Sequence, residues 1–169
     1  MITIKQGDIT NEDVEAIVNA ANSGLRGGGG VDGAIHMAAG PSVMQECLSI
    51  GGCKTGSAVI TGAGDLRARN IIHAVGPVWH GGRLKEAGLL KSAYVNSFLL
   101  AREHGLRSIA FPAISTGAYG YPIEEAAKVA LTVGKVYEKY FDEIRYVCYS
   151  KQDLDVYQRV REELNKPDK

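Results

Sequence analysis

The chain of 169 residues lacks an excess of charge of either sign. Its 19 lysine and arginine residues balance 19 aspartate and glutamate residues. A protein that binds DNA or RNA in general is expected to carry a basic surface, so the composition argues against that class. No apolar run approaches the roughly 20 residues that a membrane-spanning helix needs, so no association with a membrane is expected.

Cysteine is scarce as well. The three cysteines, Cys47, Cys53 and Cys148, have no spacing typical of a metal site, and the four histidines are not grouped with cysteines or carboxylates at ligand spacing. We therefore expect no metal and no other cofactor. The first ten residues, MITIKQGDIT, have neither the basic region nor the apolar core of a signal peptide, which favours a reduced, cytoplasmic protein.

Glycine, in contrast, is abundant. The 21 glycines cluster chiefly at 24–33, 51–64 and 117–120, which indicates special backbone conformations at chosen places rather than a flexible low-complexity chain.

Strands and helices are expected to alternate along the chain. Short runs rich in Val, Ile and aromatic residues predict strands at 2–5, 16–20, 58–61, 70–75, 108–112 and 144–149. Helices are predicted at 31–39 and 41–50, and a capping box at 10–13 predicts the start of another. Apolar residues at helical spacing predict three further helices, and a capping box at 150–153 marks the start of the last one. The apolar face of the first consists of Leu90, Tyr94, Phe98 and Ala101, that of the second of Ala127, Ala130, Leu131 and Gly134, and that of the last of Val156, Val160 and Leu164.

This alternation predicts a three-layer α/β/α domain with a mostly parallel sheet. No linker or repeat divides the chain, so we expect a single domain over 1–165 and a short C-terminal tail over 166–169. In such sheets, ligands bind beyond the carboxyl ends of the strands.

Two glycine loops lie where that rule places a ligand. The first combines Asn19-Ala-Ala-Asn22 with the run 27–33, in which Asp32 is the acidic residue. Consecutive glycines let main-chain N–H groups approach an anion, and a helix that follows adds its positive end, so a diphosphate fits. The alternative interpretation is that this glycine run is only a flexible connection between a strand and a helix.

The second loop, Ser-Thr-Gly-Ala-Tyr-Gly at 115–120, repeats this arrangement after another apolar strand. Alone it reads as an ordinary strand-to-helix turn. Together, the two loops could clamp a diphosphate from both sides, with Tyr119 over a sugar ring.

Two other phosphate motifs do not fit. The segment Cys53-Lys54-Thr55 lacks the glycine that precedes lysine in a P-loop, and no acidic residue ends a second strand about 20 residues after the first glycine run. Neither a P-loop NTPase nor a dinucleotide oxidoreductase is supported.

Five segments in the correct order resemble the macrodomain family: Gly7-Asp8-Ile9-Thr10, the Asn19 to Asn22 segment, the run 27–33, Ile72-His73-Ala74-Val75-Gly76-Pro77 and the loop 115–120. The likeness runs from about residue 4 to 157. An asparagine followed ten residues later by aspartate, with Gly-Gly-Gly-Gly-Val between them, is similar to the MacroD-type ADP-ribosylhydrolases, some of which are O-acetyl-ADP-ribose deacetylases.

The resemblance implies a central six-stranded mixed sheet with ADP-ribose across the strand ends. It also implies catalytic roles for Asn22 and Asp32, Asp32 aligning or deprotonating water. The substrate-binding residues that it implies are Asp8 and Ile9 at the adenine, Asn22 at the distal ribose, Gly28, Gly29, Gly30 and Val31 in the first loop, Ser115, Thr116, Gly117, Ala118, Tyr119 and Gly120 in the second, and Tyr149 as the aromatic against adenine.

Several of these residues have a structural alternative. Asp32 could complement the helix dipole, Asp8 could stabilise a turn, and Asn22 could be a turn residue. Tyr146 or Leu154 could replace Tyr149 at the adenine. His36 faces the site from one helical turn after Asp32 but receives no role, and His73 is expected to be a hydrogen-bonded core residue.

The activity implied by the resemblance is hydrolysis of ADP-ribose esters. The expected partners are ADP-ribose, ADP-ribosylated aspartate or glutamate on proteins, and O-acetyl-ADP-ribose. One alternative is a non-catalytic ADP-ribose reader, which would be expected to lack the pair of Asn22 and Asp32. Another is a hydrolase that acts on ADP-ribosylated nucleic acid, and the neutral net charge argues against this alternative without excluding it. The sequence does not indicate an oligomeric state.

Overall fold

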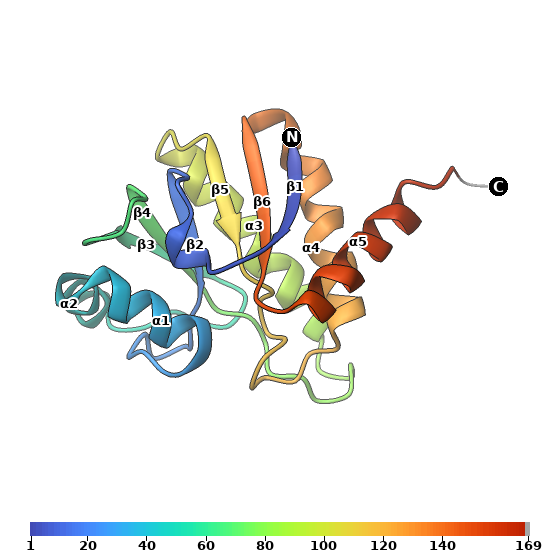
Figure 1. Ribbon diagram of the computed structural model, residues 1–169. Coiled ribbons are helices and arrows are strands. Elements are labelled where there is room, and N and C mark those ends of the chain that lie inside the picture. Colours follow the sequence, from blue (N-terminus) through green and yellow to red (C-terminus); the bar gives the residue numbers. More distant parts are fainter. Residues whose placement is uncertain (168–169) are drawn as a thin grey trace.

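The computed structural model describes residues 1–167 and contains six strands in one sheet (Figure 1). The strands are β1 (Ile2–Gln6), β2 (Ala16–Ala20), β3 (Ala58–Gly62), β4 (Asn70–Ala74), β5 (Ser108–Phe111) and β6 (Glu143–Cys148). They lie in the order β1-β6-β5-β2-β4-β3, and all neighbours are parallel except β3, which pairs antiparallel with β4 at one edge. The mixed sheet predicted for the chain is confirmed.

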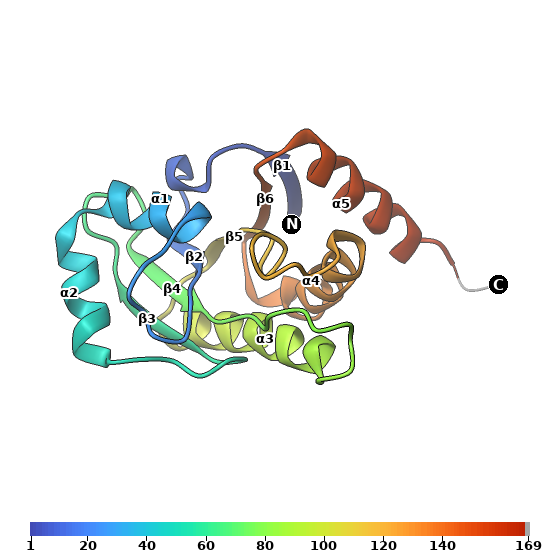
Figure 2. The same cartoon turned by 90° about the horizontal axis from the view of Figure 1, so that it is seen from below.

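Five helices cover the two faces of the sheet, as Figure 2 shows. One face carries α1 (Gly30–Ala39) and α2 (Pro41–Ile50), and the other carries α3 (Glu86–Glu103), α4 (Ile123–Tyr137) and α5 (Lys151–Leu164). Two 3-10 helices, η1 (Ile9–Asn11) and η2 (Glu138–Tyr140), complete the elements. The three-layer α/β/α architecture follows from this arrangement.

Alternation along the strands builds two separate cores. In β4, for example, Ile72 packs toward α3 and α4, whereas Ile71 packs toward α1 and α2. The predicted apolar helix faces enter these cores, and Tyr94 and Phe98 of α3 are completely buried. Burial of apolar surface on both faces fixes the strand register, because a slip of one residue would turn every core side chain toward the wrong layer.

The junction between α1 and α2 shows why glycine is needed there. Gly40 ends α1 with φ of 85° and immediately precedes Pro41, the first residue of α2. A left-handed conformation costs glycine little, and proline loses no hydrogen bond at the first helical position. The predicted boundaries of both helices agree with the structure to within one residue.

The capping box predicted at 10–13 is wrong. The structure has only the short helix η1 there, which begins after Asp8. The Asp8 carboxylate accepts hydrogen bonds from Thr10 N at 3.0 Å and from Thr10 Oγ1 at 2.7 Å. Thr10 N, which the Asp13 carboxylate would bind in a capping box, is thus already taken by Asp8, and Asp13 binds Arg145 of β6 instead.

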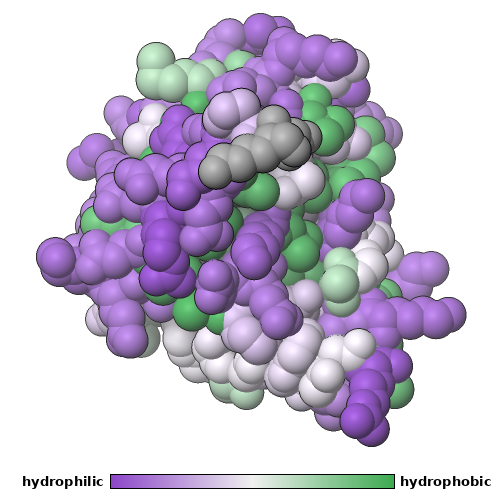
Figure 3. Space-filling view, turned by 90° about the vertical axis from the view of Figure 1, so that its right-hand side faces the viewer, coloured by the Kyte–Doolittle hydropathy of each residue, from purple (hydrophilic) through white to green (hydrophobic). Residues whose placement is uncertain are grey.

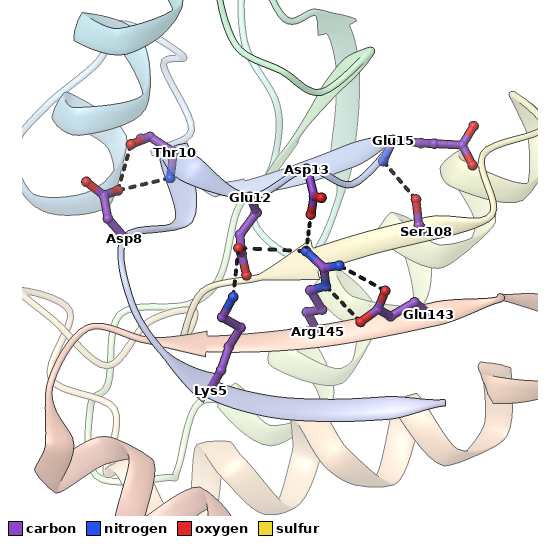
Figure 4. Close-up of polar contacts among 9 residues, drawn as sticks. All are labelled: Lys5, Asp8, Thr10, Glu12, Asp13, Glu15, Ser108, Glu143 and Arg145. Atoms are coloured by element: carbon purple, nitrogen blue, oxygen red, sulfur yellow. Dashed lines mark hydrogen bonds and ion pairs between the residues drawn. The ribbon is translucent and has the colours of Figure 1, made fainter.

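Arg145 is the centre of an ion network on the face of the sheet that also carries α1 (Figure 4). Its guanidinium binds Asp13 at 2.7 Å and Glu143 at 2.8 Å, and lies 3.7 Å from Glu12, which also accepts from Lys5 at 3.0 Å. The hydrogen bond from Arg145 lowers the pKa of the Glu143 carboxyl. Glu12 is buried, so its charge depends on these cations.

We expect Arg145→Met to lower the free energy of unfolding by about 1–3 kcal/mol at pH 7, because it removes the ion pair with Glu143 and one of the two cations beside the buried Glu12. Arg145 also lowers the folded-state pKa of Glu143, so the stabilisation that comes from the Arg145–Glu143 pair is present above about pH 4.5 and is lost as the pH falls through the folded-state pKa. Urea unfolding from pH 3 to pH 7 measures it.

The control for this prediction is Arg107→Met. Arg107 binds Asp142 through two nitrogens, but both side chains are mostly exposed. Solvent screening should make that loss small. Equal losses for both variants at pH 7 would contradict the role of burial at Arg145.

The outer face of α5 is polar, in agreement with the sequence pattern. Ser150 caps the helix, as predicted, because its hydroxyl accepts a hydrogen bond from Asp153 N at 3.1 Å. Tyr157 and Val160 lie on the inner face of α5 and are buried. Figure 3, which views the side of the molecule that carries α4 and α5, shows a mainly hydrophilic surface. Of the predicted tail, residues 168–169 lie outside the described residues. No helix within residues 1–167 is long and apolar enough to cross a membrane.

Candidate functional site

A cleft runs along the carboxyl ends of the parallel strands. One part of about 420 Å³ lies between the segments that follow β2, β4 and β5, and a second part of about 580 Å³ lies between those that follow β1, β5 and β6. The two parts share Gly30, Val31, Ala113 and Gly117, so they form one continuous cleft. Its position is the one expected for a ligand of a parallel sheet.

The cleft brings together almost all the residues that the sequence predicted for the site. Gly120 is the exception: it takes φ of 73° and closes the second loop but does not line the cleft. The predicted residues that do line it are Asp8, Ile9, Asn22, Gly28, Gly29, Gly30, Val31, Asp32, Ser115, Thr116, Gly117, Ala118, Tyr119 and Tyr149. They come from loops up to about 140 residues apart, which the sheet places side by side.

The first glycine loop leads directly into the N-terminus of α1. Gly27 and Gly30 have φ of 81° and 57°, values that favour glycine, and the N-cap residue Gly29 has no side chain to bind the first amides of the helix. These N–H groups carry the positive end of the helix dipole beside the cleft. The loop can therefore bind an anion through its backbone.

The second loop is tightly packed against the end of β4. Ser115 has φ of 69°, its carbonyl accepts from Tyr121 N at 2.9 Å, and its Oγ is buried against Gly76, where a Cβ would collide with it. Trp79 N donates to Tyr119 O at 2.8 Å. The Ser115 hydroxyl is consequently turned away from solvent, and the loop offers mainly its backbone and Tyr119 to the cleft.

Asn22 and Asp32 converge on Gly28. A Cβ built on Gly28 would stand 3.5 Å from Asp32 Oδ2 and 3.7 Å from Asn22 Nδ2, so both polar groups flank this bare stretch of backbone. Asn22 does not adopt the left-handed backbone considered for it, but its Nδ2 donates to Gly27 O at 2.8 Å and so holds the loop. Asn22 also lines the cleft.

Asp32 is only 7% exposed, and its side chain is held by a hydrogen bond from the buried Asn19 of β2. Asn19 Nδ2 donates to Asp32 Oδ1 at 2.8 Å, and His36 Nε2 lies 3.3 Å from the same oxygen. Sequence reasoning assigned no role to Asn19 or His36. The signal that could have found Asn19 is a polar residue inside the otherwise apolar strand at 16–20, because a buried polar side chain needs a partner.

His73 is a core residue with hydrogen bonds at both ring nitrogens, as the sequence suggested. Nδ1 lies 3.1 Å from Asn19 Nδ2, and Nε2 lies 2.9 Å from Thr61 Oγ1. Burial, with His36 nearby, lowers the pKa of His73 to about 4, so the ring is neutral near pH 7.

His36, Cys47 and His73 offer ligand atoms within 4.8 Å of one another, which their sequence spacing did not reveal. The chemistry is unfavourable for a metal, because His73 Nε2 is engaged by Thr61 and burial raises the pKa of the Cys47 thiol to about 11.

The other end of the cleft is formed by Asp8, Ile9 and Tyr149. Tyr149 is 83% exposed at the rim, whereas the alternative Tyr146 is 1% exposed and donates from its hydroxyl to Ala130 O in the core. Leu154 packs against the core below α5 and does not line the cleft. The structure thus leaves Tyr149 as the aromatic available to a ligand.

The charges that line the cleft are all negative. They are the carboxylates of Asp8, Asp32 and Asp153, and no lysine, arginine or histidine lines either part within the described chain. An anionic ligand must therefore be bound by backbone N–H groups and by the helix N-terminus.

Comparison with known proteins agrees with this geometry. The model of the Macro domain family matches residues 18–130. A macro domain-containing protein of Caldanaerobacter subterraneus is 53% identical, over 98% of this chain and 98% of its own length. An O-acetyl-ADP-ribose deacetylase of Salmonella typhimurium is 53% identical, over 94% and 93%.

Two solved structures are similar over nearly the whole chain. The Oceanobacillus iheyensis macrodomain with ADP has a TM-score of 0.88 at 43% identity and covers 94% of this chain and 88% of its own. The Trypanosoma brucei macrodomain in complex with ADP-ribose has a TM-score of 0.88 at 39% identity and covers 94% and 68%. Because the family model matches well over half of the chain and the relatives align along almost all of it, the chain belongs to the macrodomain family.

Proposed function

We propose that this macrodomain binds ADP-ribose in the cleft and hydrolyses ADP-ribose esters, with O-acetyl-ADP-ribose as a substrate. The observation that carries the proposal is the position of Asp32, a carboxylate that is held from below and lies beside the backbone loop that would receive the diphosphate. A site built only for binding an anion gains nothing from a carboxylate there, because like charges repel.

Each part of the cleft has a partner in ADP-ribose. Asp8 and Tyr149 meet the adenine, the N-terminus of α1 and the loop 115–119 meet the diphosphate, and Asn22 and Tyr119 meet the distal ribose. The Asp8 carboxylate caps η1 through Oδ1, and Oδ2 has no hydrogen bond within residues 1–167, so one oxygen remains for the adenine amino group.

In the proposed reaction Asp32 aligns a water molecule and accepts its proton. The water oxygen attacks the acyl carbon of the ester, the bond from that carbon to the ribose oxygen breaks, and the ribose oxygen takes up the proton that Asp32 accepted, which restores the carboxylate. The products are ADP-ribose and the free carboxylic acid. Asn22 and the two loops fix the sugar, so orientation supplies much of the rate enhancement.

Substrate choice rests on relatives as well as on the cleft. The O-acetyl-ADP-ribose deacetylase of Salmonella typhimurium, a relative of this chain, supports O-acetyl-ADP-ribose as a substrate. ADP-ribosylated aspartate and glutamate side chains carry the same ester chemistry, and we propose them as further substrates.

The decisive experiment is to incubate the protein with O-acetyl-ADP-ribose, with protein carrying ADP-ribosylated glutamate and with ADP-ribosylated nucleic acid, and to measure released ADP-ribose. We expect release from the first two. Tight binding of ADP-ribose by calorimetry without release from any of the three would show a non-catalytic reader instead.

We expect the affinity for ADP-ribose to depend little on salt. Backbone N–H groups and a helix N-terminus would bind the diphosphate in a cleft lined by no cationic side chain within residues 1–167. Screening acts most strongly on exposed charges. Calorimetry at 50 mM and 500 mM NaCl should give dissociation constants within about threefold. A tenfold or larger weakening would mean that lysine or arginine side chains reach the ligand.

A further inference from the structure

A line of hydrogen-bonding side chains continues from Asp32 into the core. Asn19 of β2 lies next to Asp32, His73 of β4 lies next to Asn19, and Thr61 of β3 lies next to His73. All three are buried. None of them lines the cleft, so none can touch a ligand there.

We propose that Asn19, held by His73, is a positioning residue that fixes Asp32 Oδ1 and so leaves Oδ2 as the oxygen that acts on water. This inference rests on the proposed hydrolase function. Oδ2 is the oxygen that lies near Gly28 and the cleft, whereas Oδ1 is engaged by Asn19 and approached by His36.

The sheet register creates the pair. In the parallel ladder between β2 and β4, Asn19 is the direct partner of His73. Alternation turns both side chains toward the layer of α1, as it does Ile17 and Ile71 two residues earlier, and Asp32 is in the first turn of that helix. The register of the sheet and the position of α1 therefore bring the three groups together.

The chemistry of the groups fixes the direction of each hydrogen bond. A carboxylate only accepts, so the Asn19 amide must turn its NH₂ toward Asp32, and its second hydrogen then points at His73 Nδ1. Nδ1 must accept, which places the ring proton on Nε2, where it meets Thr61 Oγ1. The Thr61 hydroxyl in turn donates to Gly62 O at 2.8 Å.

A purely structural role for Asn19 accounts poorly for this arrangement. Its Oδ1 is buried and has no hydrogen-bond partner within residues 1–167, which is costly in a core that otherwise consists of apolar strands. An apolar side chain at position 19 would avoid that cost. What the amide adds is the hydrogen bond to Asp32.

The neutral state of the His73 ring is needed for its hydrogen bond with Asn19. Burial and the neighbouring His36 keep the pKa of His73 at about 4, so Nδ1 retains its lone pair at neutral pH and goes on accepting from Asn19. Were the ring protonated at Nδ1, the two donors would face each other.

The first test is Asn19→Leu, which keeps approximately the volume and removes the hydrogen bonds. We expect kcat on O-acetyl-ADP-ribose to fall about 10- to 100-fold while KM and the dissociation constant of ADP-ribose stay within about threefold, because the loops are unchanged and only the carboxylate is misplaced. An unchanged kcat would overturn the proposal. Parallel rises in KM and in the dissociation constant, with kcat unchanged, would instead show a general disturbance of the cleft and would overturn it too.

The second test compares two substitutions of His73 and does not depend on the first. His73→Asn places an acceptor oxygen near the position of Nδ1, whereas His73→Leu removes the acceptor. We expect kcat of His73→Asn to exceed that of His73→Leu by about tenfold. Equal kcat values in the two folded variants would contradict the role of His73.

The control is Ser97→Ala. Ser97 is a buried polar residue of α3, on the opposite face of the sheet, and its hydroxyl donates to Ala93 O at 2.7 Å. We expect its kcat to remain that of the wild type even if stability falls. Activity of the wild type distinguishes the proposed function from the positioning role. If the wild type does not hydrolyse the ester, the proposed function is wrong. If it does, but substitutions of Asn19 and His73 leave kcat unchanged, only the positioning role is wrong.

Discussion

Asp32→Ala is expected to lower kcat on O-acetyl-ADP-ribose by about 10²–10⁴-fold, the range typical of losing a general base. The dissociation constant of ADP-ribose should stay the same or fall, because the diphosphate would be bound by backbone groups of two loops that do not depend on this carboxylate. Removal of a negative charge beside the diphosphate also reduces repulsion. Steady-state kinetics and calorimetry on the same preparation measure both effects.

The control is Asp155→Ala, which removes an exposed carboxylate of α5 whose ion pair with Lys151 is weak. Its kinetics should equal those of the wild type. If Asp32→Ala retained wild-type kcat, the assignment of Asp32 as the base would be wrong, and the proposed mechanism would have to use a group of the substrate instead.

Gly33→Ala is expected to weaken ADP-ribose binding by about 10- to 100-fold, although residue 33 does not line the cleft. A Cβ on residue 33 would collide with the carbonyl oxygen of Gly28, and that neighbour is backbone, which cannot swing aside as a long side chain can. The glycine loop must therefore shift away from α1, and the N–H groups that would bind the diphosphate shift with it. Calorimetry with ADP-ribose measures the loss.

Gly88→Ala is the matched control, because it is the same substitution near the N-terminus of another helix. A Cβ on residue 88 of α3 would meet no atom within 4 Å. Because alanine favours a helix more than glycine does, the free energy of unfolding should rise by up to about 1 kcal/mol and binding should be unchanged. If Gly33→Ala bound ADP-ribose as the wild type does, close packing of α1 on the loop would not be what positions its amides.

The outcome at particular residues shows how far sequence patterns reach. The helices at 31–39 and 41–50 were predictable because Gly40 and Pro41 act locally, through φ and through a missing N–H. The capping box at 10–13 failed because Asp8 occupies the amide of Thr10 and because Asp13 binds Arg145, 132 residues away. A local motif predicts well only while no other side chain competes for its polar groups.

The end of the cleft that we propose for adenine shows what packing adds. The family resemblance implies Tyr149 there, with Tyr146 of the same strand region as an alternative. Pairing of β6 with β1 and β5 turns Tyr146 into the core beneath α4, and Tyr149 emerges beyond the strand end. Tertiary packing therefore removes Tyr146 from the cleft, and the contact of Tyr149 with adenine stays a prediction.

The sequence by itself determined the alternation of strands and helices, the two glycine loops and the family resemblance, because periodicity and the conformational freedom of glycine are properties of the residues and their neighbours. Only the tertiary structure decided which polar groups meet. Asn19 and His73 are separated by 54 residues, and Asp32 reaches them from a helix of another layer. Their contact exists because the sheet register and the packing of α1 bring distant segments together, and no local pattern encodes those distances.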